Sequence, residues 1–183
     1  MRNRHGVTIL ALAVFSGACD QVVAPEPDSA EVATLAVTSA MAPSHITATG
    51  DFTQTGITDI EVRSAGPNTI IQQTSTGVLT GTLSGDFEDD LKVVIHPNGR
   101  FTTHFTITCV CTVNGRQGVV EMVAQDTGEL TSPTVASFAG RAVITGATGE
   151  LSGLRGNLAI NGSVDVPSGL STYSYTGRIQ FRP

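Results

Sequence analysis

The chain has 183 residues, a length that suits one domain with ample material for a hydrophobic core. Charged residues make up 14% of it, and the formal net charge is −6. Because a surface that binds nucleic acid needs clustered Lys and Arg, this balance argues against a nucleic-acid-binding protein.

The first 18 residues predict a targeting segment that is removed from the mature protein. A basic start at Arg2 and Arg4 is followed by an apolar run over residues 7–15, which is too short for a permanent membrane span. Small residues at 16–18 then precede Cys19. This arrangement resembles the lipobox of bacterial lipoproteins, in which the cysteine is acylated and becomes the mature N-terminus.

We therefore expect an exported protein of the bacterial cell envelope, anchored to a membrane by lipid attached to Cys19. The alternative is secretion with Cys19 unmodified. Removal of residues 1–18 takes away Arg2 and Arg4 and leaves a formal charge of −8. An acidic protein is repelled by anionic headgroups, so membrane attachment would depend on the lipid and not on charge.

Residues 19–44 have the composition of a tether between the anchor and a folded domain. They contain three prolines, scattered acidic residues and many Ala, Thr and Ser. The run Val32–Met41 is more apolar than a pure linker and could pack as an edge strand or a short helix. The folded domain is expected over residues 45–183.

From residue 45 onward the sequence alternates with a period of two, which is typical of half-buried antiparallel strands. The alternation predicts strands over 78–87 and 91–95, with the acidic residues 86–90 at a solvated turn. The clearest strand runs from Phe101 to Val113. Its apolar face carries the following residues: Phe101, Phe105, Ile107, Cys109, Cys111 and Val113.

Asn114-Gly115 is a strong two-residue hairpin signal, since a type I′ turn needs positive φ at both positions. A turn of this kind pairs Val113 with Arg116. The resulting register carries Val120, Met122 and Ala124 to the apolar face and directs Glu121 outward, opposite Thr108.

Further strands are expected over residues 134–145, 157–166 and 171–181, and the last one places Tyr173 and Tyr175 on its apolar face. No amphipathic helix of useful length is visible after residue 45. Glycines recur on the apolar faces, where they permit sharp coiling of a small barrel. The sequence therefore predicts an all-β protein, a closed antiparallel barrel of about eight strands.

A glycine-rich segment over residues 146–156 has a spacing found in dinucleotide-binding loops. Those loops lie between a parallel strand and a helix, with further βαβ units after them. Here an alternating strand follows, near the C-terminus. The segment is instead expected to be a turn between barrel strands, with Glu150 and Arg155 serving that turn.

Together with Tyr175-Thr176-Gly177-Arg178-Ile179, the segment resembles the late glycine-rich part and closing strand of the allene oxide cyclase-like barrel superfamily. That superfamily includes plant allene oxide cyclases, dirigent proteins and many uncharacterised bacterial proteins. The resemblance covers about residues 45–183. It implies an eight-stranded barrel that holds a small apolar molecule and can form a homo-oligomer. No catalytic residue of a cyclase or dirigent protein can be carried over to this chain.

The sequence offers few side chains that could take part in a reaction or bind a metal. Cys109 and Cys111 share a strand face at a spacing that disfavours a disulfide, so two buried thiols are expected; a strained or intermolecular bridge and a metal site are the alternatives. The apolar face shows no clear carboxylate or imidazole. No cofactor and no metal are predicted.

Three functions fit this sequence. The first is a binding protein whose barrel holds a small apolar ligand. The second is a cyclase or isomerase, for which Tyr173, Tyr175, Cys109 and Arg141 are the polar groups nearest the interior. The third is a structural or interaction lipoprotein without a ligand. The candidate ligand-lining residues are the following: Phe101, Phe105, Cys109, Cys111, Met122, Tyr173 and Tyr175.

Overall fold

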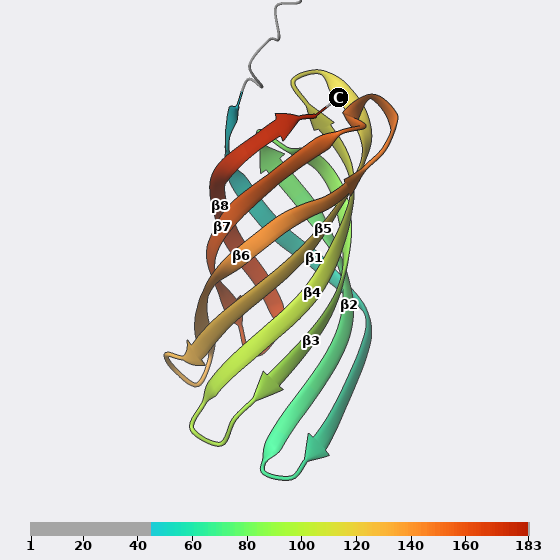
Figure 1. Ribbon diagram of the computed structural model, residues 1–183. Helices are drawn as coiled ribbons and strands as arrows, with labels where there is room; N and C mark the ends of the chain where they lie inside the picture. The colour runs from blue at the N-terminus through green and yellow to red at the C-terminus, as the bar shows by residue number, and fades with distance from the viewer. Residues whose placement is uncertain (1–44, 183) are drawn as a thin grey trace, which may run out of the picture. The chain divides into compact units, whose positions relative to one another are not determined.

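The structure is a computed structural model that describes residues 45–182; the predicted signal segment, Cys19 and the tether lie outside the described residues. Eight strands pair antiparallel in chain order, and the last closes on the first (Figure 1). This confirms the predicted all-β closed barrel. The strands are β1 (Ile46–Ala65), β2 (Asn68–Gly81), β3 (Ser84–Ile95), β4 (Arg100–Val113), β5 (Arg116–Leu130), β6 (Val135–Ala147), β7 (Leu154–Asp165) and β8 (Leu170–Phe181).

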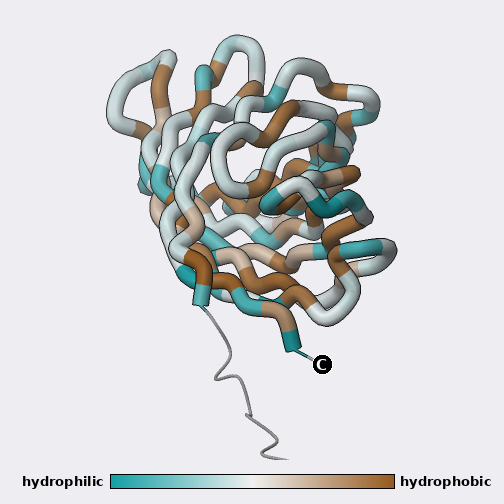
Figure 2. The backbone as a smooth tube through the Cα atoms, turned by 90° about the horizontal axis from the view of Figure 1, so that it is seen from above, coloured by the Kyte–Doolittle hydropathy of each residue, from teal (hydrophilic) through white to brown (hydrophobic). Residues whose placement is uncertain are grey.

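The up-and-down order gives the barrel two different ends. One end, here called the hairpin end, carries the β1–β2, β3–β4, β5–β6 and β7–β8 connections. At the other, terminal end, β1 begins and β8 ends, beside the remaining connections. Apolar and polar residues interleave along the strands when the barrel is seen from above (Figure 2). No helix in residues 45–182 is long and apolar enough to cross a membrane.

The predicted hairpin at Asn114-Gly115 is confirmed. Both residues have positive φ, 51° for Asn114 and 78° for Gly115, as a type I′ turn requires. Val113 pairs with Arg116, and Thr108 lies opposite Glu121. The side chains of Val120, Met122 and Ala124 are buried as expected, so the turn fixes which residues of β5 point into the barrel.

The segment between residues 78 and 90 departs from the prediction. β2 ends at Gly81 and β3 begins at Ser84, so the chain reverses within the expected strand over 78–87. Gly81 has a φ of 99° that suits this tight reversal. The expected acidic turn over 86–90 is therefore wrong, because these residues form the middle of β3. Alternation continues on both sides of the reversal, which concealed it in the sequence.

The glycine-rich segment after β6 is a turn between strands, as expected. Gly149–Leu151 form a short 3₁₀ helix, η1, and Leu151 is buried at the terminal end of the barrel. The Glu150 carboxylate accepts a hydrogen bond of 2.9 Å from the backbone N–H of Gln117 in β5. Glu150 thus fastens this turn to the neighbouring hairpin.

Candidate functional site

The buried polar side chains of the barrel gather in one half. In the described part of the chain, they all lie toward the hairpin end, while apolar side chains such as Leu151 and Leu154 fill the terminal half. The polar set consists of Gln54, Gln73, Ser75, Asp89, Thr103, Asp126 and Ser171. Since burying a polar group without a partner costs free energy, their collection at one end calls for an explanation.

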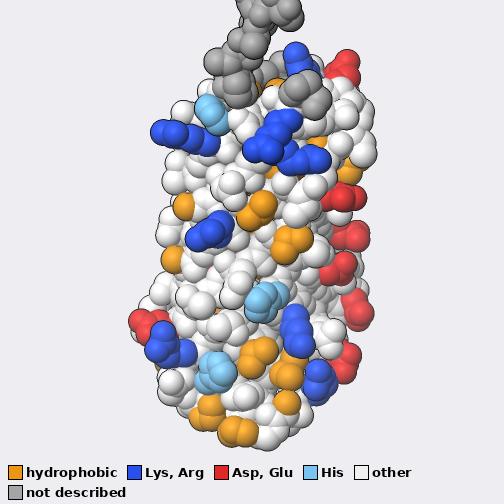
Figure 3. Space-filling view, viewed as in Figure 1, with side chains coloured by type: hydrophobic (Ala, Val, Ile, Leu, Met, Phe, Trp, Pro, Cys, Tyr) orange, Lys and Arg blue, Asp and Glu red, His pale blue; other side chains and the backbone are white. Residues whose placement is uncertain are grey.

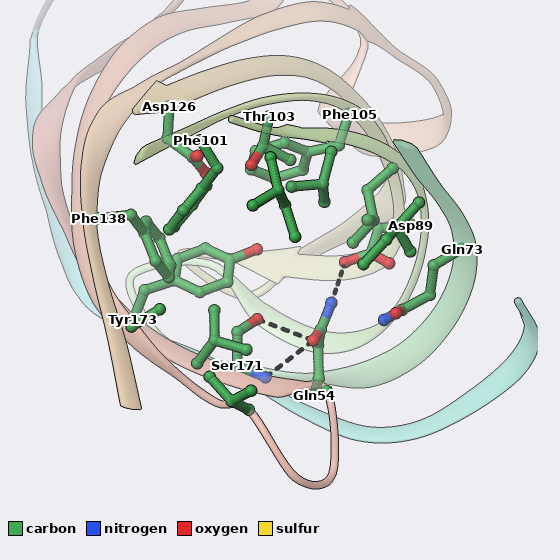
Figure 4. A pocket seen from close by; sticks show the side chains of 18 of the residues that line it. Gln54, Gln73, Asp89, Phe101, Thr103, Phe105, Asp126, Phe138, Ser171 and Tyr173 are labelled. Carbon is green, nitrogen blue, oxygen red and sulfur yellow. Dashed lines mark hydrogen bonds between the residues drawn. The ribbon is translucent and has the colours of Figure 1, made fainter. Parts of the chain in front are cut away.

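All of these side chains except Ser75 line a cavity of about 170 Å³ that lies inside the hairpin half (Figure 4). Its walls are mostly apolar and come from strands all around the barrel: Ile71, Leu91, Val93, Ile95, Phe101, Phe105, Ala136, Phe138 and Val164. An engineered cavity of roughly 150 Å³ in another protein binds benzene. A ring-sized molecule therefore fits this space.

The mouth of the cavity lies among the strand ends at the hairpin end. Leu130 at the end of β5 and Val166 just beyond β7 line the cavity and are also exposed. Hydrophobic side chains gather at this end of the molecule in the space-filling view (Figure 3). The apolar lining of the cavity thus continues to the surface.

Gln54 organises one wall of the cavity. Its side-chain N–H₂ donates hydrogen bonds of 2.8 Å to Ser75 Oγ and to Asp89 Oδ2, and the Ser75 hydroxyl donates to Asp89 Oδ1. Its carbonyl oxygen accepts from the backbone N–H and the hydroxyl of Ser171, at 2.9 and 2.8 Å.

The position of Gln54 explains this network. Pairing between β1 and β8 ends at Thr53 and Thr172, so the ladder between these strands stops beside Gln54. The Gln54 side chain accepts the Ser171 N–H that the ladder would otherwise satisfy. The amide therefore seals the wall where the strands separate, and it holds Asp89 in place.

Two other polar groups in the cavity are left unpaired. Asp126 Oδ1 on β5 and Tyr173 Oη on β8 are buried without a hydrogen-bond partner among residues 45–182. Both residues line the cavity, and the Tyr173 hydroxyl projects into it in Figure 4. Buried polar atoms usually have partners, so these two atoms mark where a bound molecule would complete the site.

Burial also changes the acidity of these groups. Desolvation raises the pKa of Asp126 to about 6, although the Thr103 hydroxyl and the nearby His104 favour its charged form. Desolvation likewise raises the pKa of Asp89, against its hydrogen bonds from Ser75 and Gln54. The pKa of Tyr173 is raised well above its usual value, first by burial and then by Asp89 and Asp126. Tyr173 is therefore a neutral donor at physiological pH.

The structure separates the predicted ligand-lining residues into two groups. Phe101, Phe105 and Tyr173 line the cavity. The others are buried in the packed core and do not form its wall: Cys109, Cys111, Met122 and Tyr175. The Tyr175 hydroxyl accepts a hydrogen bond from the Leu83 N–H at 2.9 Å and lies 3.1 Å from the Thr80 carbonyl oxygen.

The expectation of two free thiols is wrong, because Cys109 and Cys111 form a disulfide. Residues two apart on an extended strand stand near 7 Å apart, which led to that expectation. Here the Cα atoms are 5.3 Å apart, within the usual range for a disulfide. The strand is therefore contracted at this point.

Two further expectations about the interior are corrected. The inward face does carry carboxylates, Asp89 and Asp126, and Arg141 is exposed on β6 and points away from the interior. The alternation in the sequence already placed both carboxylates on the inward face, because Asp89 stands between the inward-facing Phe87 and Leu91, and Asp126 lies two residues after the inward-facing Ala124.

No group of three His, Cys, Asp or Glu side chains suited to a metal ion occurs within residues 45–182.

Comparisons with known proteins find no matching family model and no matching curated protein. Among solved structures, the pterocarpan synthase dirigent protein PsPTS1 is similar, with 13% identity and a TM-score of 0.47 over 76% of this chain and 97% of that chain. The pterocarpan synthase dirigent protein GePTS1 is similar as well, with 12% identity and a TM-score of 0.47 over 77% and 90% of the two chains. Likenesses this distant transfer no ligand or reaction to the present chain.

Proposed function

We propose that this barrel binds a small, mostly apolar molecule carrying one or two hydrogen-bonding groups. The observation that carries the proposal is the pair of buried atoms in the cavity, Asp126 Oδ1 and Tyr173 Oη, for which the described chain supplies no partner. A protein that only needed a stable core would gain nothing from burying these groups unpaired.

The two atoms would form hydrogen bonds with different groups of the ligand. Asp126 in its charged form accepts a hydrogen bond, so it suits a hydroxyl group of the ligand. The neutral Tyr173 hydroxyl donates, so it suits a carbonyl or ether oxygen. The surrounding walls are aromatic and aliphatic, and they favour a ring or branched hydrocarbon skeleton.

A matched series of bicyclic probes tests this proposal. Indane has only the hydrocarbon skeleton, 1-indanone adds an acceptor, and 1-indanol adds a donor that also accepts. Isothermal titration calorimetry at pH 7.5 should show the two oxygen-containing probes binding about tenfold more tightly than indane, because one well-placed hydrogen bond is worth about 1.4 kcal/mol here.

Two variants assign the effect to the site. Tyr173→Phe should remove the preference for indanone, and Asp126→Asn should weaken the preference for indanol. Met122→Leu is a matched control in the packed core and should leave all three affinities unchanged. Equal affinity of the wild-type protein for the three probes, or no binding of any of them, would contradict the proposal.

A second candidate is an enzyme that moves a proton during a cyclisation or isomerisation. The observation in its favour is the pKa of about 6 at Asp126, close to the operating pH of a general acid or base. In deuterated buffer, Asp126 acting as a base would exchange hydrogen for deuterium at the carbon next to the indanone carbonyl. Exchange that is faster than in buffer and absent from Asp126→Asn supports catalysis; exchange at the buffer rate restricts the cavity to binding.

We propose further that the protein is exported and held at a membrane by lipid on Cys19. The Cys109–Cys111 disulfide supports export, because disulfides persist in oxidising compartments. Native mass spectrometry of the protein purified from its own host would report the mass added at Cys19 and any molecule retained in the cavity. A mature chain that still contains residues 1–18 would contradict export by this route.

A further inference from the structure

One strand of the barrel has a long unpaired edge. β1 is the longest strand, with 20 residues, but it pairs with β8 only from Ile46 to Thr53. Beyond Thr53 its sole strand partner in the described chain is β2. The β1–β2 hairpin reaches further at the hairpin end than its neighbours in Figure 1. The outer edge of β1 therefore presents unpaired backbone N–H and C=O groups.

Only the last part of this edge has the regular geometry that another strand needs. Two β-bulges interrupt β1, between Gln54 and Gly56 and between Ile57 and Asp59. Bulges commonly protect an edge against pairing. From Asp59 to Ala65 the pairing with β2 is regular again. Seven residues are therefore available to a partner strand.

Both faces of this segment are exposed, and they differ in character. Ile60 and Val62 are 52% and 60% exposed and lie on the same face as the cavity-lining Gln73 and Ile71 with which they pair. Asp59, Glu61 and Arg63 occupy the other face. Two large apolar side chains on an exposed strand edge are a feature that proteins usually avoid or cover.

We propose that this edge pairs with the same edge of a second copy of the chain, as an antiparallel strand across a twofold axis. The charges favour one register among those centred on residues 60–63. When Val62 lies opposite Val62 of the second copy, Glu61 lies opposite Arg63 on both sides of the axis, and no like charges face each other. A shift that centres Glu61 or Arg63 on the axis places two like charges directly opposite.

The same register also suits the apolar face and the backbone. The two Val62 side chains meet at the axis, and Ile60 lies opposite Ser64. The pairing joins the two β1–β2 hairpins into one four-stranded sheet, so the exposed apolar side chains gain neighbours and the edge gains hydrogen bonds. Formation of this dimer requires no ligand in the cavity, because only residues of the β1 edge take part in the pairing.

Charge reversal tests the register directly. Sedimentation equilibrium on the purified full chain should show a dimer. Glu61→Arg should weaken dimerisation at least tenfold, because it places the new guanidinium group opposite Arg63 of the second copy, and Arg63→Glu should do the same. The double variant E61R/R63E exchanges the two charges and should restore the dimer. Glu88→Arg makes the same change on the exposed face of β3 and should have no effect.

Three results would overturn the proposal. The first is a wild-type chain that is monomeric at every concentration, as it would be if its own residues 32–41 covered the edge. The second is an oligomer that Glu61→Arg leaves intact, which would place the interface elsewhere. The third is a double variant that remains as dissociated as the single variants while circular dichroism reports the wild-type β-sheet signal.

Discussion

Tyr175 and Tyr173 stand two residues apart on the inward face of β8, one in each half of the barrel. Tyr175 is tied to backbone groups of Thr80 and Leu83 at the terminal end. Tyr173 is buried as a residue to a similar extent, but its hydroxyl finds no partner anywhere in residues 45–182. The same residue type, on the same strand and face, is thus a structural fastening in one half and an unpaired donor in the other.

The difference extends to the whole of each half. The terminal half is filled by apolar side chains, so it contributes stability through burial. In the hairpin half, carboxylates, amides and hydroxyls take the place of apolar side chains and surround a cavity. This exchange costs stability, a pattern that supports the proposed binding site, because functional sites commonly give up stability in this way.

Replacing one phenylalanine of the packed core and one that borders the cavity should give the largest contrast. Phe52 is fully buried and packs against the rings of Phe87, Tyr173 and Tyr175, so Phe52→Ala should cost about 3–5 kcal/mol of unfolding free energy. Phe138 already borders the cavity, so Phe138→Ala removes fewer contacts and should cost less. Urea denaturation followed by circular dichroism measures both. Equal losses would mean that the interior is packed as tightly around the cavity as it is around Phe52.

The buried Asp126 should make the stability of the hairpin half depend on pH. Asp126 has a folded-state pKa of about 6, above the value of about 3.9 in an unfolded chain, so the native state binds the proton more tightly. Its stabilising effect is complete below pH 3.9 and is lost as the pH rises through 6. Asp126→Asn should therefore raise stability at pH 7.5 by up to about 3 kcal/mol and change little at pH 3.5.

An exposed carboxylate serves as the control for that measurement. Asp86→Asn on the outer face of β3 should leave the difference in stability between pH 3.5 and pH 7.5 as it is in the wild type. If Asp126→Asn also leaves this difference unchanged, the Asp126 side chain is solvated and burial does not raise its pKa.

Removing each tyrosine hydroxyl sharpens the comparison further. Tyr175→Phe leaves the buried Leu83 N–H without its acceptor and should cost about 2 kcal/mol. Tyr173→Phe removes a buried hydroxyl that bonds to no described residue, so its stability should equal or exceed that of the wild type. Thermal unfolding of the two variants at one pH makes the test. A larger loss for Tyr173→Phe would reveal a partner for that hydroxyl.

The sequence predicted which apolar side chains point inward better than it predicted the polar wall of the cavity. Alternation and the Asn114-Gly115 turn were sufficient to place Val113, Val120 and Met122 in the core, because an apolar side chain on a strand has one favourable side. The same reasoning failed at Asp89, since a carboxylate among alternating residues is first assigned to solvent. Its burial depends on Gln54 and Ser75, which come from two other strands.

The cavity could not be predicted for a related reason. Phe101, Phe105 and Tyr173 were expected to line it together with Cys109, Cys111, Met122 and Tyr175, because all of them share the inward face. Inward direction follows from the alternation within one strand. The depth at which the interior stops being filled depends on the register between strands and on where β1 and β8 separate, at Thr53 and Thr172.

The smallest effect should come from the disulfide in the terminal half. Cys109 and Cys111 are only two residues apart, so the bond closes a very short loop and restricts the unfolded chain little. For a loop of three residues, the chain-entropy relation gives about 1.6 kcal/mol. Unfolding with and without a phosphine reductant should differ by no more than this. A C109A/C111A variant, which the reductant cannot affect, provides the control.

Because the Cys109–Cys111 pair lies away from the cavity, reduction of the disulfide should leave the affinity for 1-indanol unchanged. A loss of binding on reduction would show that the two halves are coupled, and the terminal half would then have to be counted as part of the site.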